Sequence, residues 1–323
     1  MTADAATAPT TRCGGHTVHW LDDGLQRLGL VPGFGGSAAA WLLHPQAGAA
    51  PRQPEVPFHL WRPWFGDPDP FSVASLPLVP WSNRISGGGF EAQGRFHPLR
   101  PNRAGEPCPI HGEGWLQPWE VTSHGVHRLE MRLLSDRFMG SPYRYLATQT
   151  CQLLPDGLYH ELTVTHLGAE PLPYGLGQHP WLLRAPGTRL RADVSGVWLS
   201  HADRLPREHT GGLGDWDLRE GIDAHGTLID NAFTGWCGPA VVDWPDAGWT
   251  LTVDNEHPGD EACLLVFRPE SGPSFCVEPV THPVDAVHLP GQPGLRWLEP
   301  GAAMRLALRW RFARRPAGAA ARA

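Results

Sequence analysis

The chain has 323 residues, of which 41% are hydrophobic and 15 are tryptophan, so one large domain can bury a sizeable core. It carries 38 glycines and 34 prolines without a Gly-X-Y period, which excludes collagen and favours short strands and turns over long helices. All 26 basic residues are arginines, and the absence of lysine excludes Schiff-base catalysis, pyridoxal phosphate attachment and a P-loop. A net charge of −7 without a basic stripe argues against a nucleic-acid partner.

The first residues lack the charged start and apolar run of a signal peptide, and no stretch of the sequence is apolar enough to cross a membrane. We therefore expect a cytoplasmic protein with no membrane partner. The cysteines are scattered without a C-x-x-C pair, so free and mostly buried thiols are expected rather than a zinc knuckle or a redox motif. They are Cys13, Cys108, Cys151, Cys237, Cys263 and Cys276.

The chain is predicted to form one domain over residues 12–313, with flexible flanks at 1–11 and 314–323. The proline-rich stretch Pro51–Pro80 is interpreted as an irregular excursion and not as a domain boundary. No internal repeat occurs at a fixed period, which argues against a propeller or solenoid.

Alternation of apolar and polar residues predicts strands at residues 129–133, 249–254 and 304–312. Two further alternating runs between Ala147 and His166 flank Pro155-Asp156-Gly157, a sequence typical of a β-hairpin. No window shows a convincing helical stripe. Because a parallel sheet would need crossover helices, these strands predict an all-β fold, a large antiparallel sandwich with few short helices.

Two candidate functional residues lie where glycine or proline fixes the backbone. Arg84 follows Asn83 and lies shortly before a triple glycine. Its guanidinium either donates hydrogen bonds beside a loop that approaches a ligand closely, or belongs to a surface arginine before a flexible turn. His111 lies among prolines and glycines that would pin its imidazole, in a functional or a purely structural role.

Three more candidates lie in apolar segments. His179 precedes a proline, and a partly buried imidazole can hold or release a proton at neutral pH. Glu278 lies in an apolar strand, where desolvation would raise its pKa and strengthen it as a base, unless it faces water on an edge strand. Asp230 could accept hydrogen bonds from a polyol or merely cap a turn.

No metal site and no nucleophilic serine site is expected. The chain has 17 histidines, but H-E-x-x-H is absent and His282 with His288 lacks an obvious third ligand. No G-x-S-x-G elbow is present.

Four tryptophans lie near the candidate polar segments and could present flat faces to a sugar, although core packing would explain them equally well. They are Trp81, Trp115, Trp181 and Trp236.

Taken in order, these segments resemble the aldose 1-epimerase (galactose mutarotase) family over roughly residues 30–312. The matching pieces are Asn83-Arg84-Ile85 with Gly89-Phe90, Ile110-His111-Gly112, His179-Pro180-Trp181, Asp230 with Phe233, and Glu278-Pro279 with Thr281 and Pro283-Asp285-Ala286.

The resemblance implies a β-supersandwich and a cofactor-free interconversion of the α and β anomers of a free aldose. It implies Glu278 as the general base for the C1 hydroxyl and His179 as the general acid for the ring oxygen. Opening a hemiacetal takes one proton off the anomeric hydroxyl and puts one onto the ring oxygen, so we expect a carboxylate and an imidazolium on opposite sides of the ring to suffice. The residues that bind and orient the substrate would be Asn83, Arg84, His111, Trp181 and Asp230.

Three positions depart from the family pattern. They are Trp81-Ser82 ahead of the Asn-Arg pair, Glu113 after the histidine motif, and Gln178 before His179. Because these positions are expected to border the ligand, they leave the identity of the sugar open.

Other functions remain open at this point. One is a non-catalytic sugar-binding or sugar-sensing protein. Another is a hexose-6-phosphate 1-epimerase, which would need a second arginine from among Arg95, Arg100 and Arg103 to meet the phosphate. Glycoside hydrolysis needs two carboxylates flanking one bond, for which only Glu278 with Asp230 can be nominated. The protein could be a monomer, or a homodimer formed by edge strands.

Overall fold

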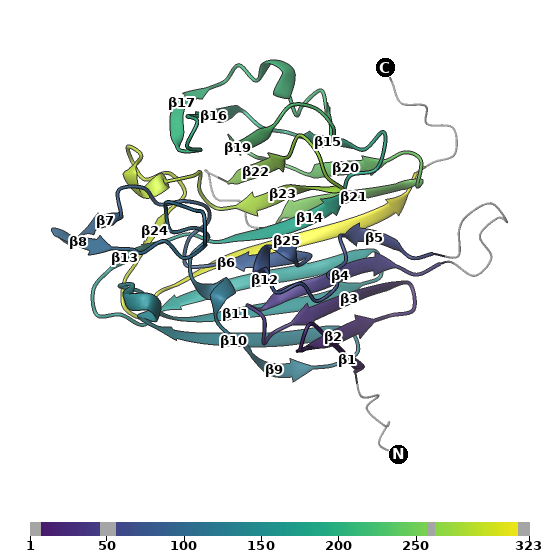
Figure 1. Cartoon of the computed structure of the whole chain (residues 1–323), viewed down its shortest axis with the longest axis horizontal. Coiled ribbons are helices and arrows are strands. Elements are labelled where there is room, and N and C mark those ends of the chain that lie inside the picture. The colour runs from purple at the N-terminus through teal and green to yellow at the C-terminus, as the bar shows by residue number, and fades with distance from the viewer. Residues whose placement is uncertain (1–7, 46–55, 257–261, 316–323) are drawn as a thin grey trace.

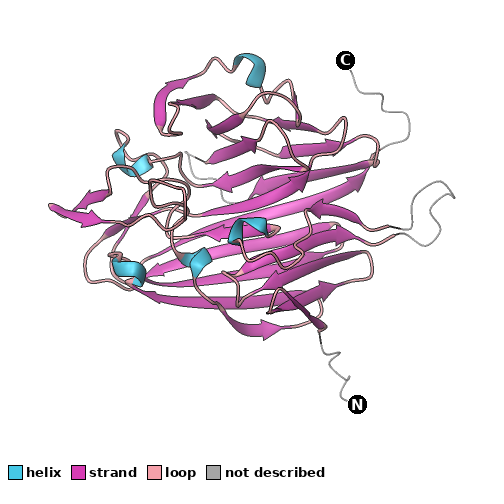
Figure 2. Ribbon diagram, viewed as in Figure 1, coloured by secondary structure: helices cyan, strands magenta, loops and turns pink. Residues whose placement is uncertain are grey.

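The computed structural model describes residues 8–45, 56–256 and 262–315. Antiparallel strands dominate this part of the chain and form two large sheets (Figures 1 and 2). The helical segments among the described residues are three-residue 3₁₀ turns, namely η1 (Pro70–Ser72), η2 (Gly114–Leu116), η3 (Phe138–Gly140), η4 (Gly214–Trp216) and η5 (Ala286–His288). None of the helices in the described residues has the length and apolar character that crossing a membrane requires.

The larger sheet contains twelve strands within the described residues. In spatial order they are β1 (Thr10–Cys13), β2 (His16–Asp22), β3 (Gln26–Val31), β4 (Ser37–Leu43), β5 (Phe58–Trp61), β14 (Gly177–Leu183), β23 (Ser274–Val280), β22 (Cys263–Arg268), β19 (Ile229–Thr234), β16 (Gly196–Ser200) and β17 (Pro206–Thr210), with β6 (Ser75–Leu78) pairing with β14 and β4.

The second sheet has nine strands in the described part of the chain. Its order is β18 (Ile222–Asp223), β15 (Arg189–Ala192), β20 (Ala240–Trp244), β21 (Trp249–Asn255), β25 (Ala303–Arg314), β12 (Gly157–His166), β11 (Arg144–Leu154), β10 (Arg128–Asp136) and β9 (Glu120–His124). Two small pairs complete the fold, β7 (Gly89–Ala92) with β8 (Arg95–Pro98), and β13 (Leu172–Tyr174) with β24 (Arg296–Leu298). The β7–β8 hairpin projects from one end of the molecule (Figure 1).

The predicted antiparallel sandwich is confirmed, and so are the strands read from alternation, which correspond to β10, β21 and β25. The predicted hairpin is β11–β12, where Leu154 pairs with Gly157 and leaves Pro155-Asp156 as the turn. A side chain at Gly157 would place its Cβ 1.9 Å from the carbonyl oxygen of Trp310, so the neighbouring strand permits only glycine there.

Some predicted boundaries and environments differ from the structure. The proline-rich stretch is not wholly irregular, because β5, η1 and β6 lie within it; its first residues, 51–55, lie outside the described residues. Strand β1 begins at Thr10 and β25 ends at Arg314, so both strands extend into the predicted flanks. Residues 1–7 and 316–323 of these flanks lie outside the described residues. None of the six cysteines forms a disulfide. Three are buried, two are half-buried and Cys237 is exposed, so only half of them match the expectation of buried thiols.

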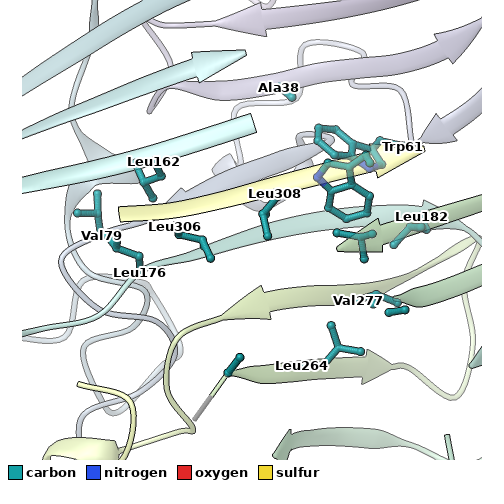
Figure 3. Packing of buried hydrophobic residues seen from close by; sticks show 14 of the residues in the cluster. Ala38, Trp61, Val79, Leu162, Leu176, Leu182, Leu264, Val277, Leu306 and Leu308 are labelled. Carbon is teal, nitrogen blue, oxygen red and sulfur yellow. The ribbon is translucent and has the colours of Figure 1, made fainter. Parts of the chain in front are cut away.

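The main core lies between the two sheets. Figure 3 shows Leu306 and Leu308 of β25 facing Trp61 of β5 and Leu182 of β14, and these side chains belong to one continuous buried cluster. Val277 of β23 and Leu264 of β22 join the same cluster. Successive side chains of a strand point to opposite faces of its sheet. The residues next to Leu182, Val277 and Leu264 in sequence therefore point to the outer face of the twelve-stranded sheet. The candidate site lies on that outer face.

Candidate active site

Strand register brings His179 and Glu278 together. Strands β14 and β23 are antiparallel neighbours, with Gly177 opposite Val280 and Trp181 opposite Cys276. Counting along this ladder places His179 directly opposite Glu278, so both side chains emerge on the same face. Two residues that are 99 positions apart in the chain thus become cross-strand neighbours. Glu278 lies at the centre of the sheet and is 1% exposed, so the alternative of an edge-strand glutamate facing water is wrong.

The same face continues across two further strands. Glu278 pairs with Leu265 of β22, and Phe267 of β22 pairs with Asp230 of β19. Paired residues share a face, so Asp230 extends the polar row that His179 and Glu278 begin. Leu265 and Phe267 supply apolar surface between the polar groups.

These residues form the floor of a cleft of about 340 Å³. Its walls come from segments that connect strands: Arg62 follows β5, Asp69 and Phe71 lie at η1, and two loops contribute Asn83-Arg84 and Arg103, Glu106, Ile110 and His111. A floor of sheet residues and walls of loop residues is a common arrangement for a small-molecule site.

The Nε2 atom of His179 lies 3.4 Å from Oε1 of Glu278. A sugar ring does not fit between atoms this close, so the expectation of an acid and a base on opposite sides of the ring is wrong. Both groups approach a ligand from the floor of the cleft. The two oxygens that they would address, the C1 hydroxyl and the ring oxygen, are both bonded to C1, so neighbouring groups can reach them from one side.

Burial sets the protonation of this pair. It lowers the pKa of His179 to about 3. It raises the pKa of Glu278 well above its usual range, as does the negative charge of Asp230, while Arg84 opposes the rise. When the pair holds one proton, burial therefore favours that proton on Glu278. Moving this proton to His179 gives an imidazolium beside a carboxylate. The proton can therefore be carried either by Oε1 of Glu278 or by Nε2 of His179.

Hydrogen bonding fixes the tautomer of His111. Its Nδ1 accepts the backbone N–H of Asn83 at 3.0 Å, so the remaining proton of the neutral ring is on Nε2. Burial lowers the pKa of His111 well below the usual value, and the nearby His179 adds to this effect. His111 therefore presents a neutral imidazole with one N–H to donate.

Arg84 is held in a defined orientation. Its Nε and Nη2 atoms donate to Oε2 and Oε1 of Glu106 at 2.9 and 3.0 Å, and Nη1 donates to Oδ1 of Asn83 at 3.3 Å. The same Nη1 lies 3.9 Å from Oδ2 of Asp230. The two-pronged contact with Glu106 fixes the plane of the guanidinium.

The loops that carry Asn83 and His111 are anchored by buried and half-buried side chains. Nε2 of His282 accepts the N–H of Ser82 at 3.0 Å, and Asp285 Oδ1 accepts the N–H of Ser86 at 2.9 Å. Asn102 donates to the carbonyl oxygens of Ile110 and Gly112 at 2.9 and 2.7 Å, and accepts the N–H of Ile110 at 2.8 Å. These contacts hold the walls of the cleft in place.

All seven residues nominated from the sequence line this one cleft: Asn83, Arg84, His111, His179, Trp181, Asp230 and Glu278. Three of the four nominated tryptophans do not. Trp81, Trp115 and Trp236 are each 3% exposed within the cores, and core packing is the correct interpretation for them.

The residues that depart from the family pattern do not border the cleft either. Glu113 points to the hydroxyl of Ser135 at 2.9 Å, and Gln178 donates to Ser75 at 2.6 Å. The expectation that these positions, with Trp81 and Ser82, surround the ligand is therefore wrong. His282 and His288 do not form a joint ligand set, because His282 anchors Ser82 and His288 contacts Asp285 at 2.8 Å.

Sequence reasoning missed six lining residues: Arg62, Asp69, Phe71, Glu106, Leu265 and Phe267. The first three lie in the proline-rich stretch that was dismissed as irregular. Phe71 packs against the rings of both His111 and His179, with centroid distances of 5.7 and 5.9 Å. Prolines restrict the backbone of a loop and can hold its side chains in place at a binding site. The high proline content of this stretch is therefore the sequence feature that could have indicated these three residues.

Comparison with known proteins identifies the family. The sequence model described as "Aldose 1-epimerase" matches residues 63–311, which is most of the chain. The chain belongs to the aldose 1-epimerase family. The resemblance noted from the five segments is thereby confirmed.

The chain is also similar to individual proteins and solved structures. The uncharacterized Escherichia coli K12 protein YphB is 34% identical over 235 residues, covering 71% of this chain and 80% of YphB. A crystal structure of a candidate aldose 1-epimerase from Escherichia coli K12 has a TM-score of 0.83 at 28% identity, covering 93% of this chain and all of that one. A galactose mutarotase-like protein from Clostridium acetobutylicum has a TM-score of 0.78 at 15% identity, covering 95% of this chain and 98% of that one, which shows the same fold.

Proposed function

We propose that this chain is an aldose 1-epimerase that interconverts the α and β anomers of a free aldose by opening and closing the sugar ring. The observation that carries the proposal is the contact of 3.4 Å between His179 and Glu278 on the floor of the cleft. Ring opening removes a proton from the C1 hydroxyl and adds one to the ring oxygen, so it needs one base and one acid beside C1.

In the proposed mechanism the Glu278 carboxylate takes the proton of the C1 hydroxyl while the His179 imidazolium protonates the ring oxygen. The open-chain aldehyde then lies beside a protonated Glu278 and a neutral His179, which is the distribution that burial favours. Rotation about C1–C2 presents the other face of the aldehyde. Closing the ring returns both protons, so the pair ends as it began, and both transfers use side chains of the chain itself.

The remaining polar groups of the cleft suit the hydroxyls of a sugar. Arg84 and the Nε2–H of His111 are donors, and the Asp230 carboxylate is an acceptor. Trp181 and Phe71 add aromatic surface for the C–H groups of the ring, and Arg62 and Arg103 each cover one face of these rings. Holding the sugar in one orientation adds to the contribution of the proton transfers.

The cleft favours a neutral sugar over a sugar phosphate. Of the three arginines considered for a phosphate, Arg103 lines the cleft, whereas Arg95 pairs with Glu170 at 3.8 Å and Arg100 lines a separate small cavity. Arg103 lies 3.5 Å from Asp69, and Glu106 occupies two donors of Arg84. We therefore expect glucose or galactose to be preferred over glucose 6-phosphate.

The proposal is tested by following freshly dissolved α-glucose and α-galactose by polarimetry. The protein is expected to accelerate equilibration, and Glu278→Gln or His179→Ala is expected to lower kcat by about 10²- to 10⁴-fold, because each removes one proton transfer. Glu161→Gln, which changes a carboxylate on β12 in the other sheet, serves as the control and should keep the full rate.

The competing function is sugar binding without catalysis. It predicts saturable quenching of tryptophan fluorescence with no change in the equilibration rate, and binding that survives Glu278→Gln. Finding this pattern for every aldose tested would refute the proposed epimerase.

A further inference from the structure

A third side chain with metal-ligating chemistry lies beside the acid–base pair. Cys276 is two residues before Glu278 on β23 and opposite Trp181 on the ladder, so its thiol is on the same face as the pair. The ligand atoms of His179, Cys276 and Glu278 all lie within 4.8 Å of one another. Nothing in the proposed ring opening uses the thiol, which is fully buried.

The spacing and the chemistry of these three groups suit a tetrahedral zinc ion. Two nitrogen or oxygen ligands of such an ion are about 3.3 Å apart, given metal–ligand distances of about 2.0–2.1 Å. The 3.4 Å between Nε2 of His179 and Oε1 of Glu278 matches this spacing. Imidazole, thiolate and carboxylate are the side chains that zinc prefers, and three protein ligands leave the fourth position open to the cleft.

A second observation points to an unfilled role for Glu278. Its Oε2 atom is buried without a hydrogen-bond partner among the described residues, although the side chain lines the cleft and is 1% exposed. Buried carboxylate oxygens without partners are costly, and either a sugar hydroxyl or a cation would satisfy this one.

The surrounding charges are mixed. Asp230 is close enough to act on Glu278 and favours a cation, whereas Arg62, Arg84 and Arg103 oppose one. Arg62 is turned toward protein acceptors, donating to the carbonyl oxygen of Val73 at 3.0 Å. Arg84 is likewise committed to Glu106. The remaining group that faces the pair, His111, is neutral.

We propose that His179, Cys276 and Glu278 form an inhibitory site for Zn²⁺ and similar thiol-preferring divalent cations. The bound ion occupies the acid and the base at once, so the cation and a sugar exclude each other. The site itself depends only on the three side chains, whereas its inhibitory effect rests on the proposed epimerase activity.

The test of the site uses Co²⁺ as a spectroscopic substitute for Zn²⁺ on the intact protein. We expect one Co²⁺ per chain with a thiolate-to-cobalt charge-transfer absorption, which Zn²⁺ displaces. The absorption should disappear in Cys276→Ser and persist in Cys108→Ser, which removes a half-buried thiol that lies within electrostatic range of Arg84 and Glu106. No thiolate absorption in the unmodified chain, or one that survives Cys276→Ser, would overturn the site.

Its effect on activity is measured separately. Zn²⁺ should inhibit mutarotation competitively with the aldose, and a chelator should restore the rate. Cys276→Ser should keep the basal rate and weaken inhibition at least about tenfold, because losing even a residue that only orients a metal ligand costs about 10- to 100-fold in metal affinity. If mutarotation is absent while the cobalt spectrum is present, the proposed function fails and the metal site stands. If zinc inhibits both variants equally, the inhibitory role is wrong.

Discussion

At the scale of single residues, hydrogen bonds between protein groups decide which atoms of the cleft can bind a ligand. The backbone N–H of Asn83 occupies Nδ1 of His111 and thereby places the donor proton on Nε2. Glu106 fixes the orientation of the Arg84 guanidinium by accepting hydrogen bonds from two of its nitrogens. Glu106 also lines the cleft itself, so its contribution can be separated from that of the pair by kinetics.

We predict that Glu106→Gln raises KM about tenfold with a smaller change in kcat. The amide keeps one acceptor but loses the negative charge, so the guanidinium of Arg84 is no longer fixed for the sugar hydroxyls. Steady-state mutarotation kinetics measure this, with Glu91→Gln on the exposed side of β7 as the control. A fall in kcat at unchanged KM would mean instead that Glu106 takes part in the proton transfers.

At the scale of elements, a buried glutamine joins the two sheets. Gln26 of β3 is fully buried, donates to the carbonyl oxygens of Leu154 and Gly157 at 2.7 and 3.0 Å, and accepts the indole N–H of Trp41 at 3.0 Å. It thus ties β3 and β4 of the larger sheet to the turn of the β11–β12 hairpin. Each of these partners is itself buried or part-buried and has little access to water.

We predict that Gln26→Leu lowers the free energy of unfolding by about 2–4 kcal/mol, because the substitution removes the side-chain hydrogen bonds to these three groups and a fourth to Asp23 at 3.1 Å. Urea denaturation measures the change. Gln152→Leu, on the same hairpin, removes a side chain that accepts a hydrogen bond from the exposed Arg128 and should cost less than about 0.5 kcal/mol. Equal losses in the two variants would show that Gln26 does not act as a link between the sheets.

At the scale of the whole molecule, the sequence predicted the architecture better than the walls of the site. Alternation in segments such as 304–312 is a local property, and the seven nominated residues lie in segments whose order resembles a family. The pairing of β14 with β23 and the closure of loops 62–71 and 99–111 over the sheet depend on long-range packing. The adjacency of His179 and Glu278, the role of Glu106, and the burial of Trp81 and Trp115 therefore required the structure.

Buried neutral histidines make the stability of the whole fold sensitive to acid. Burial lowers the pKa of His160 to about 4 and that of His282 to about 4. In the unfolded chain these rings take up protons near pH 6.5, well before they do so in the folded state. Their contribution to stability is therefore complete above about pH 6.5 and is lost as the pH falls toward about 4.

We predict that His160→Gln reduces the loss of stability between about pH 7 and about pH 4.5 by about 2–3 kcal/mol relative to the unmodified chain. Glutamine can still donate to Oε1 of Gln149, which His160 contacts at 3.1 Å, but it does not titrate. Urea denaturation at the two pH values measures the difference. An unchanged pH dependence would show that His160 is not held neutral by burial.

The central claim is that His179 and Glu278 act together on C1 of a free aldose. Saturation transfer between the anomeric proton signals of α- and β-glucose or galactose at equilibrium tests it most directly, because it reports interconversion without a starting excess of either anomer. We predict transfer with the unmodified protein that falls to the buffer level in both Glu278→Gln and His179→Ala. Transfer that persists in either variant, or its absence for every aldose that the protein binds, would contradict the account.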